Sequence, residues 1–354
     1  MPLLALTLAI LYREILVKKI RVVVLACIIG IIIALPAVFA TFSSQGLMRL
    51  SGTTAFSGDH PYYAESVERY AQALEKNNAF ERIYYSRKFT HVKVFAAQYV
   101  SHFAPAWLFS GAARENHKVP FTGLLYGIEA PFLLYGLFLA VTKFRSREVG
   151  VIGALLFFSP LPAAVTTQAP HAMRAFTMLP SFVILTGLGF SSALAWIRAS
   201  SPSLFGIARL AVIPLILALV SAGQNYFIMF PKTQSDSFQY ALHKALVFAG
   251  QHEKEVDRVI VSNQHNLYQS YMFYLFENKY DPELYVKNGG TVSGGYARMH
   301  TIGSYEFRPV VWDNDKELHN VLILADVSEV PESSSSAVFA NLDGTEAVVG
   351  EFTK

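Results

Sequence analysis

The sequence has little cysteine and little charge. Its 354 residues include one cysteine, Cys27, which excludes a disulfide within the chain, so any extracytoplasmic part must depend on its own core. Charged residues make up 16%, below the roughly one quarter found in soluble domains. A large part of the chain therefore faces something other than water. The net charge of +3 is small and scattered, and it gives no support for a nucleic-acid partner.

Several catalytic motifs are also missing. The sequence contains no HExxH, P-loop, GxSxG or CxxC spacing, so zincin, NTPase and serine-hydrolase functions have no support. It also shows no internal repeat. The search for function therefore depends on where the apolar and polar residues lie.

Long apolar runs dominate two parts of the chain. A membrane-spanning helix needs roughly 20 mainly apolar residues. Five runs meet this requirement: Val22–Phe42, Thr122–Thr142, Val149–Thr167, Ala175–Ile197 and Phe205–Phe230. A sixth, Pro2–Val17, is short and is interrupted by Arg13 and Glu14. The pattern predicts a multi-pass α-helical membrane protein with about six transmembrane helices.

Basic residues in the short loops predict the orientation of these helices. Lysine and arginine concentrate in cytoplasmic loops, and here they occupy alternate connections, near Lys18, Arg145 and Arg198. The segments 44–121 and 231–354 then lie outside the cytoplasm, and the transmembrane parts are 1–43 and 122–230. We expect the cell (inner) membrane as the location. Because the first run is short and begins at Met1, the chain is expected to be the C-terminal part of a larger membrane protein.

The two outer segments have patterns of their own. Asp59–Lys76 predicts an amphipathic helix with Tyr63, Val67, Tyr70, Ala71 and Leu74 on its apolar face, and the aromatic stretch Val92–Phe109 is expected along the outer membrane surface. The C-terminal segment predicts an α/β domain. Its expected helices are Phe238–Gln251 and Asn266–Glu277, and its expected strands are Asp257–Ser262, Glu283–Lys287, Phe307–Trp312, Val321–Ala325, Val338–Asn341 and Ala347–Phe352.

The segment Ser159–Arg174 carries the first candidate site. Pro170 is placed like the first residue of a helix, and His171 and Arg174 are three apart, so they would share one helix face near Gln168. A helix start with a guanidinium suits an anion such as phosphate. The alternative is that Arg174 extends to lipid headgroups and His171 is a surface histidine.

Three further residues are candidate site-lining groups. Glu129, early in a predicted membrane helix, is a functional candidate unless it lies shallow enough to stay hydrated. Tyr126 lies three residues before it. His102 lies among aromatic residues, where a packed boundary histidine is the more common role.

Three stretches together resemble the C-terminal half of GT-C membrane glycosyltransferases, within which they look most like bacterial relatives of protein O-mannosyltransferases and aminoarabinose transferases. The first is YVSHFAPAWLFSG with GLLYGIEAPFLLYG, and the second is Pro160–Gly189 with its HAMR. The third is the exit from the last helix, continuing to YDPEL. The resemblance covers nearly the whole chain, although each motif alone is loose.

The resemblance implies transfer of a sugar from a polyprenyl-phosphate donor to a protein, lipid or glycan acceptor outside the membrane. A carboxylate would act as general base, and cationic groups, with or without a divalent metal, would stabilise the departing phosphate. In such enzymes the catalytic acid lies in a first outer loop that these residues do not include, so the catalytic residue stays unassigned. Arg174, His171 and Gln168 are the candidates for phosphate contact.

Two other classes remain open. A non-catalytic membrane protein could bind polyprenyl lipid or glycan through the same outer surfaces. A lipid or solute transporter is less favoured, because the predicted spans are almost free of charge at mid-depth.

Overall fold

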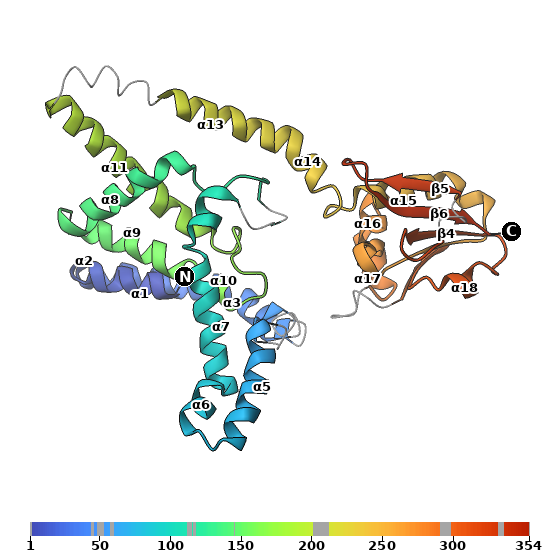
Figure 1. The fold of residues 1–354 in the computed structure, drawn as a ribbon, viewed down its shortest axis with the longest axis horizontal. Helices are drawn as coiled ribbons and strands as arrows, with labels where there is room; N and C mark the ends of the chain where they lie inside the picture. The colour runs from blue at the N-terminus through green and yellow to red at the C-terminus, as the bar shows by residue number, and fades with distance from the viewer. Residues whose placement is uncertain are drawn as a thin grey trace. The chain divides into compact units, whose positions relative to one another are not determined.

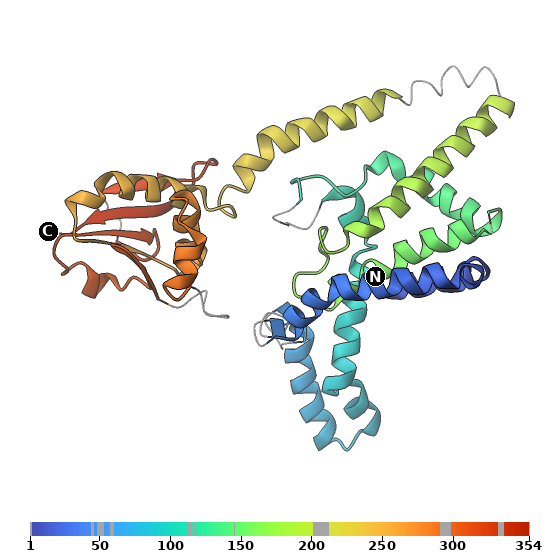
Figure 2. The ribbon, with the colours of Figure 1, turned by 180° about the vertical axis from the view of Figure 1, so that it is seen from behind.

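The computed structural model describes residues 2–43, 46–47, 53–56, 60–111, 115, 118–144, 146–200, 212–290, 299–331 and 336–353. The chain divides into two compact units, Met1–Asn225 and Tyr226–Lys354. The first unit is helical, and the second holds a small mixed sheet flanked by helices (Figures 1 and 2).

Four helical stretches among the described residues are long and apolar enough to cross a membrane: Ile20–Phe42, Arg147–Ala164, Phe176–Ser200 and Val212–Thr233. They correspond to four of the five predicted runs. The fifth prediction, Thr122–Thr142, is too long, because the helical stretch begins only at Gly127. The reason lies before it: Leu125 N donates to Leu108 O at 2.9 Å, so the chain packs against another turn there instead of coiling. The predicted start of the last run, residues 205–211, lies outside the described residues.

The helices of the first unit connect as follows. At the N-terminus are α1 (Pro2–Leu11), α2 (Arg13–Lys18) and α3 (Ile20–Phe42); then come α5 (Pro61–Glu75), α6 (Ala79–Tyr84) and α7 (Arg87–Ser101), followed by the π-helical turn η1 (Ala106–Ser110). The chain continues through η2 (Gly127–Glu129), α8 (Ala130–Thr142), α9 (Arg147–Phe158), α10 (Leu161–Ala164), η3 (Phe176–Met178), α11 (Leu179–Ser200) and α13 (Val212–Gln224).

Two glycines let α8 and α11 pack closely. A Cβ on Gly136 would lie 2.8 Å from the carbonyl carbon of Leu185 and closer still to its oxygen. A Cβ on Gly189 would meet Phe132 in the same way, 2.8 Å from its carbonyl carbon. Small residues at such a crossing allow two backbones to approach each other, which is the common packing device of apolar helices in membranes.

The segment 44–121 contains one expected helix, but its buried face differs from the predicted one. Helix α5 falls within the predicted Asp59–Lys76, and it buries Tyr63, Ser66 and Ala73. Val67 and Leu74, predicted to be on the apolar face, are 72% and 48% exposed. Two of the buried residues, Ser66 and Ala73, are small, so α7 can pack alongside this face of α5. Both views show the two helices side by side (Figures 1 and 2).

The boundary between the units falls in η5 (Asn225–Met229), and the second unit continues with α14 (Phe230–Thr233), α15 (Tyr240–His252) and η6 (Glu253–Glu255). Strand β1 (Arg258–Val261) leads to η7 (His265–Leu267), α16 (Ser270–Glu277), α17 (Pro282–Lys287), β2 (His300–Ile302), β3 (Tyr305–Phe307) and α18 (Trp312–Asp315). Strands β4 (Val321–Asp326), β5 (Ala337–Ala340) and β6 (Glu346–Phe352) complete the unit. The strand order is β2-β3-β1-β4-β6-β5, in which β1 pairs in parallel with both β3 and β4, and the other pairings are antiparallel.

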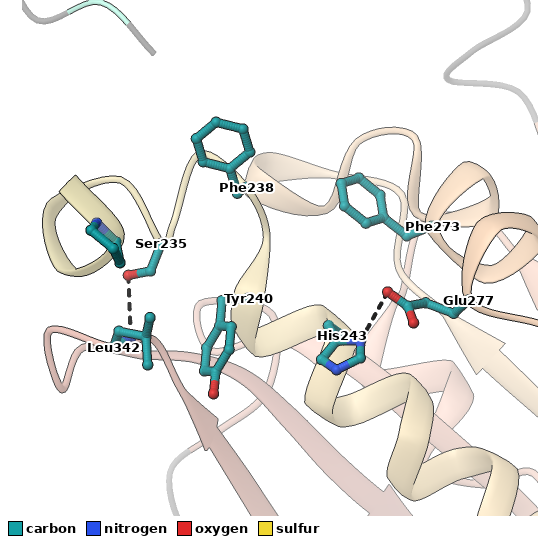
Figure 3. Close-up of a pocket in the computed structure, with 8 residues that line it drawn as sticks. Ser235, Phe238, Tyr240, His243, Phe273, Glu277 and Leu342 are labelled. Carbon is teal, nitrogen blue, oxygen red and sulfur yellow. Dashed lines mark hydrogen bonds and ion pairs between the residues drawn. The ribbon is translucent and has the colours of Figure 1, made fainter. Parts of the chain in front are cut away.

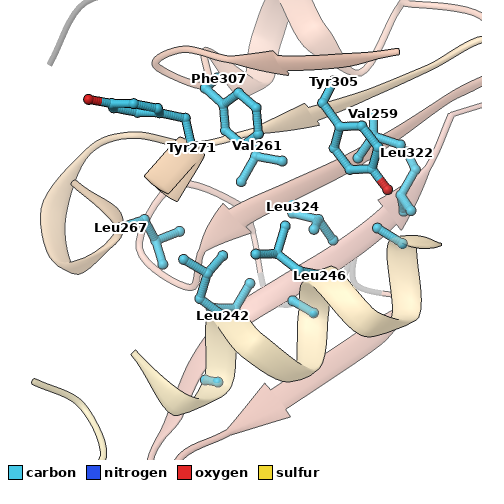
Figure 4. Packing of buried hydrophobic residues seen from close by; sticks show 14 of the residues in the cluster. Leu242, Leu246, Val259, Val261, Leu267, Tyr271, Tyr305, Phe307, Leu322 and Leu324 are labelled. Atoms are coloured by element: carbon cyan, nitrogen blue, oxygen red, sulfur yellow. The ribbon is translucent and has the colours of Figure 1, made fainter. Parts of the chain in front are cut away.

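The central strand β4 is buried on both of its faces. In β4, Leu322 and Leu324 pack on the side of α15 and α16 (Figure 4). Val321, Ile323 and Ala325 pack on the opposite side. This alternation follows from the period of two in a strand, and a strand buried on both faces is expected to be apolar throughout.

Two predicted strands are wrong. Residues Glu283–Lys287 form helix α17, because the Asp281 side chain accepts from Glu283 N as an N-cap and Pro282 occupies the first turn. The predicted strand Phe307–Trp312 shares only its first residue with an observed strand, because β3 ends at Phe307. Its last residue, Trp312, already begins α18. Pro309 lacks the N–H that a continuing ladder would need.

Candidate functional site

The candidate site of the first unit begins where α7 ends. Helix α7 buries Thr90, Val94 and Gln98, and the next residue on that face, His102, is fully buried. His102 Nδ1 lies 2.8 Å from Gln98 O, so it carries the proton, and Nε2 accepts from His171 N at 3.3 Å. Burial lowers the pKa of His102, and its backbone hydrogen bonds and the Glu115 charge act in the opposite direction. His102 therefore serves as a neutral support for the segment that carries His171.

Glu115 supports the same segment from another side. Its Oε1 accepts from Trp107 Nε1 at 2.6 Å, and its Oε2 accepts from Ala172 N at 2.7 Å. Lys118 is 7% exposed, donates to Trp107 O at 3.2 Å and lies near the Glu115 charge. Burial lowers the pKa of Lys118, and Glu115 partly opposes this. Sequence reasoning missed both residues. The only signal was a pair of opposite charges three residues apart after an aromatic stretch.

Arg174 is held by the backbone and side chain of the preceding loop. Its Nη1 donates to Thr166 Oγ1 and to Thr167 O, both at 2.7 Å. The loop is in turn fixed by Thr53–Ala55, because Thr167 N donates to Thr53 O and Ala55 N donates to Val165 O. Arg174 is half-buried, and its Nη2 and Nε make no hydrogen bond to a residue that the structure describes. One end of the fork is therefore anchored while the other can receive an anion.

The predicted helix start at Pro170 is wrong. His171 to Ala175 form a turn closed by Ala175 N donating to His171 O at 3.1 Å, and helical structure resumes only at Phe176. His171 and Arg174 are nevertheless neighbours, since Arg174 N lies 3.4 Å from His171 Nδ1. An anion site here would rest on the guanidinium and not on a helix dipole.

Of the other predicted site residues, Gln168 lies in the loop before the turn at His171–Ala175, whereas Glu129 and Tyr126 contact each other at the start of another helix. Gln168 lies in the same loop, is exposed, and has a positive φ of 64°. Glu129 Oε2 accepts from Tyr126 N at 2.8 Å, so the carboxylate caps the start of the helical stretch and pairs with the backbone of Tyr126. This bond gives Glu129 a structural role, and it places both residues at the helix entrance.

The described residues do not fit a metal centre. No group of three His, Cys, Asp or Glu side chains among them could hold a metal ion. Both carboxylate oxygens of Glu115 and both ring nitrogens of His102 already have partners.

The second unit contains a separate pocket of about 310 Å³ (Figure 3). Its polar groups include His243 and Glu277, whose Nδ1 and Oε1 form an ion-pair contact at 2.9 Å without the alignment of a hydrogen bond. Its apolar lining comes from Pro231, Phe238, Tyr240, Phe273 and Leu342.

No protein-family model, curated protein or solved structure matches this chain. The resemblance to GT-C glycosyltransferases stays a prediction from the sequence.

Proposed function

We propose that this chain is part of a multi-pass membrane glycosyltransferase that takes a sugar from a polyprenyl-phosphate donor at the outer face of the cell membrane. The observation that supports this best is Arg174, a half-buried residue with its guanidinium anchored at Nη1 and its remaining donors unpaired within the described residues. The acceptor would be a protein, lipid or glycan.

Such a guanidinium suits the departing phosphate. When the bond between the sugar and phosphate breaks, negative charge grows on the phosphate oxygens, and donors that are already oriented stabilise this charge without reorganising. Arg174 meets this condition because Thr166 and Thr167 fix its position. A fork of parallel donors also matches phosphate geometry better than a point charge does.

The general base is not assigned to these residues. Glu115 accepts a hydrogen bond at each carboxylate oxygen and Glu129 accepts one at Oε2, so the printed contacts of both side chains are structural. The proposed contribution of this chain is therefore carrier binding.

The test is binding and transfer with the whole chain in membrane vesicles. Wild type is expected to retain a radiolabelled polyprenyl-phosphate sugar, and Arg174→Ala should weaken binding about 10- to 100-fold, since a charged hydrogen bond contributes about 1.5–3 kcal/mol. Arg174→Lys should recover only part of it. Arg69→Ala, in α5, is the matched loss of an arginine and should bind as wild type does.

Unchanged binding by Arg174→Ala would refute the phosphate assignment. In a full-length enzyme, the same substitution should abolish transfer while expression stays intact. If label binds through Arg174 but never leaves the lipid, the role is carrier binding without transfer.

A further inference from the structure

Large apolar side chains are exposed on one part of the second unit. Phe238, Tyr268, Met272 and Phe276, which we call the aromatic surface, are 53%, 57%, 38% and 79% exposed. Gln239 Nε2 donates to Tyr268 O at 3.2 Å, which brings the segment after α14 beside the start of α16. Met272 and Phe276 are four apart on α16 and share one face. A cluster of this kind indicates an interaction surface.

The aromatic surface is joined by ring contacts to the first residues of the second unit, which form the end of an apolar helical stretch. The stretch Val212–Thr233 is long and apolar enough to cross a membrane, and none of its residues is buried. At its end, the Tyr226 and Phe230 rings stack with centroids 6.0 Å apart, and Phe230 meets Phe238 edge-on, also at 6.0 Å. A row of rings thus leads from the helix onto the α/β unit.

Charged residues near this surface also fit a lipid boundary. Exposed Lys232, Lys244 and Lys279 each lie one or two residues from a residue that lines the neighbouring pocket. The acidic groups there are Glu277, which is in contact with His243, and Asp236 and Asp343, which follow the lining residues Ser235 and Leu342. In the close-up, Phe238 and Phe273 lie above the pair of His243 and Glu277 (Figure 3). Aromatic side chains with nearby lysines are typical of the interface between headgroups and acyl chains.

We propose that the aromatic surface binds the α/β unit to the surface of the lipid bilayer. Phe238, Tyr268, Met272 and Phe276 enter the interface beside the end of the apolar helix, and the lysines contact anionic headgroups. A lipid surface is favoured over a protein partner because the same aromatic row begins on a helix of membrane-spanning length. The proposal does not depend on the activity proposed above.

The test uses nitroxide labels on the full chain in vesicles of phosphatidylcholine and phosphatidylglycerol. Cys27 is the only cysteine and is replaced first by Cys27→Ala. Single labels then follow from Phe276→Cys and, in a separate chain, Phe238→Cys. Val311→Cys is the matched control, because Val311 is 52% exposed, close to the 53% of Phe238, but lies beside α18.

We expect labels at 238 and 276 to be broadened by oxygen, which concentrates in lipid, and protected from a water-soluble nickel complex. The label at 311 should behave in the opposite way. Equal access of the nickel complex to all three positions would overturn the proposal. Protection of 238 and 276 from both reagents would also overturn it, because it would show coverage by protein or a second copy of the chain. Two independent labelled positions keep the test valid if one variant fails to fold.

Discussion

At the crossing of α8 and α11, the effect of an alanine substitution on the free energy of unfolding distinguishes backbone packing from helix propensity. Alanine at Gly136 would place its Cβ 2.8 Å from the Leu185 carbonyl carbon. Carbon atoms normally approach to about 3.5–4.0 Å. The atom in the way is backbone, which cannot rotate aside as a side chain can, so the two helices would have to separate.

The cost of this separation can be set against the gain in helix propensity. Overpacking typically costs about 1–3 kcal/mol, and a backbone contact favours the upper end. Glycine to alanine in a helix gains up to about 1 kcal/mol. Gly136→Ala should therefore lose about 2 kcal/mol net. Gly187→Ala, on α11 where nothing lies within 4 Å, should show only the gain.

The assay is thermal unfolding of the purified chain in one detergent, followed by the loss of the monodisperse peak. The two variants should differ by about 3 kcal/mol, which corresponds to roughly 6–12 °C at about 2–4 °C per kcal/mol. Gly189→Ala, on the other side of the contact, should behave like Gly136→Ala. If Gly136→Ala and Gly187→Ala unfold at the same temperature, the close approach of these helices is refuted.

Three further predictions concern buried polar groups. Glu115→Gln should lower stability by about 1–3 kcal/mol, because the amide offers one acceptor to two N–H donors; thermal unfolding measures this. Since burial lowers the folded pKa of His102, the unfolded chain binds more protons below about pH 6.5. The free energy of unfolding should therefore fall on acidification from pH 7.5 to 5.5, by at most about 1.4 kcal/mol per pH unit, and His102→Gln should reduce this slope. Asp315→Asn should lower the free energy of unfolding of the second unit by about 1–3 kcal/mol, because Asp315 accepts hydrogen bonds from Arg308 at 2.7 and 3.0 Å. Limited proteolysis of that unit should become faster. The control is Asp313→Asn, which should have no effect because Asp313 is exposed.

Elements dominated by composition were predictable. The run Val22–Phe42 lies within α3, and Val321–Ala325 lies within β4, because continuous apolar residues leave few other solutions. Elements whose structure depends on a single polar contact could not be predicted from the sequence. Glu283–Lys287 has the composition of a strand, but the Asp281 cap turns it into helix α17.

The candidate site shows the same division. Arg174 is a candidate from the sequence because an arginine beside an apolar run is visible there. Glu115 is not visible in this way, because one of its two partners is the backbone N–H of Ala172, a group that every residue except proline possesses. The capping role of Glu129 is not visible in the sequence, because its bond to Tyr126 N depends on where the helix begins.

The short pairing of Thr53–Ala55 with Val165–Thr167 has a consequence for communication along the chain. Thr167 receives a hydrogen bond from Arg174 through its carbonyl oxygen and gives one to Thr53 through its N–H. If residues 53–55 moved away from this loop, Thr167 would lose the hydrogen bond that its N–H gives to Thr53 O, and the anchor of Arg174 would be weakened. By thermodynamic reciprocity, an anion that favours the anchored arginine would favour the pairing of the two segments by the same free energy. We therefore expect the antiparallel bridge between Thr54 and Thr166 to couple residues 53–55 to anion binding at Arg174.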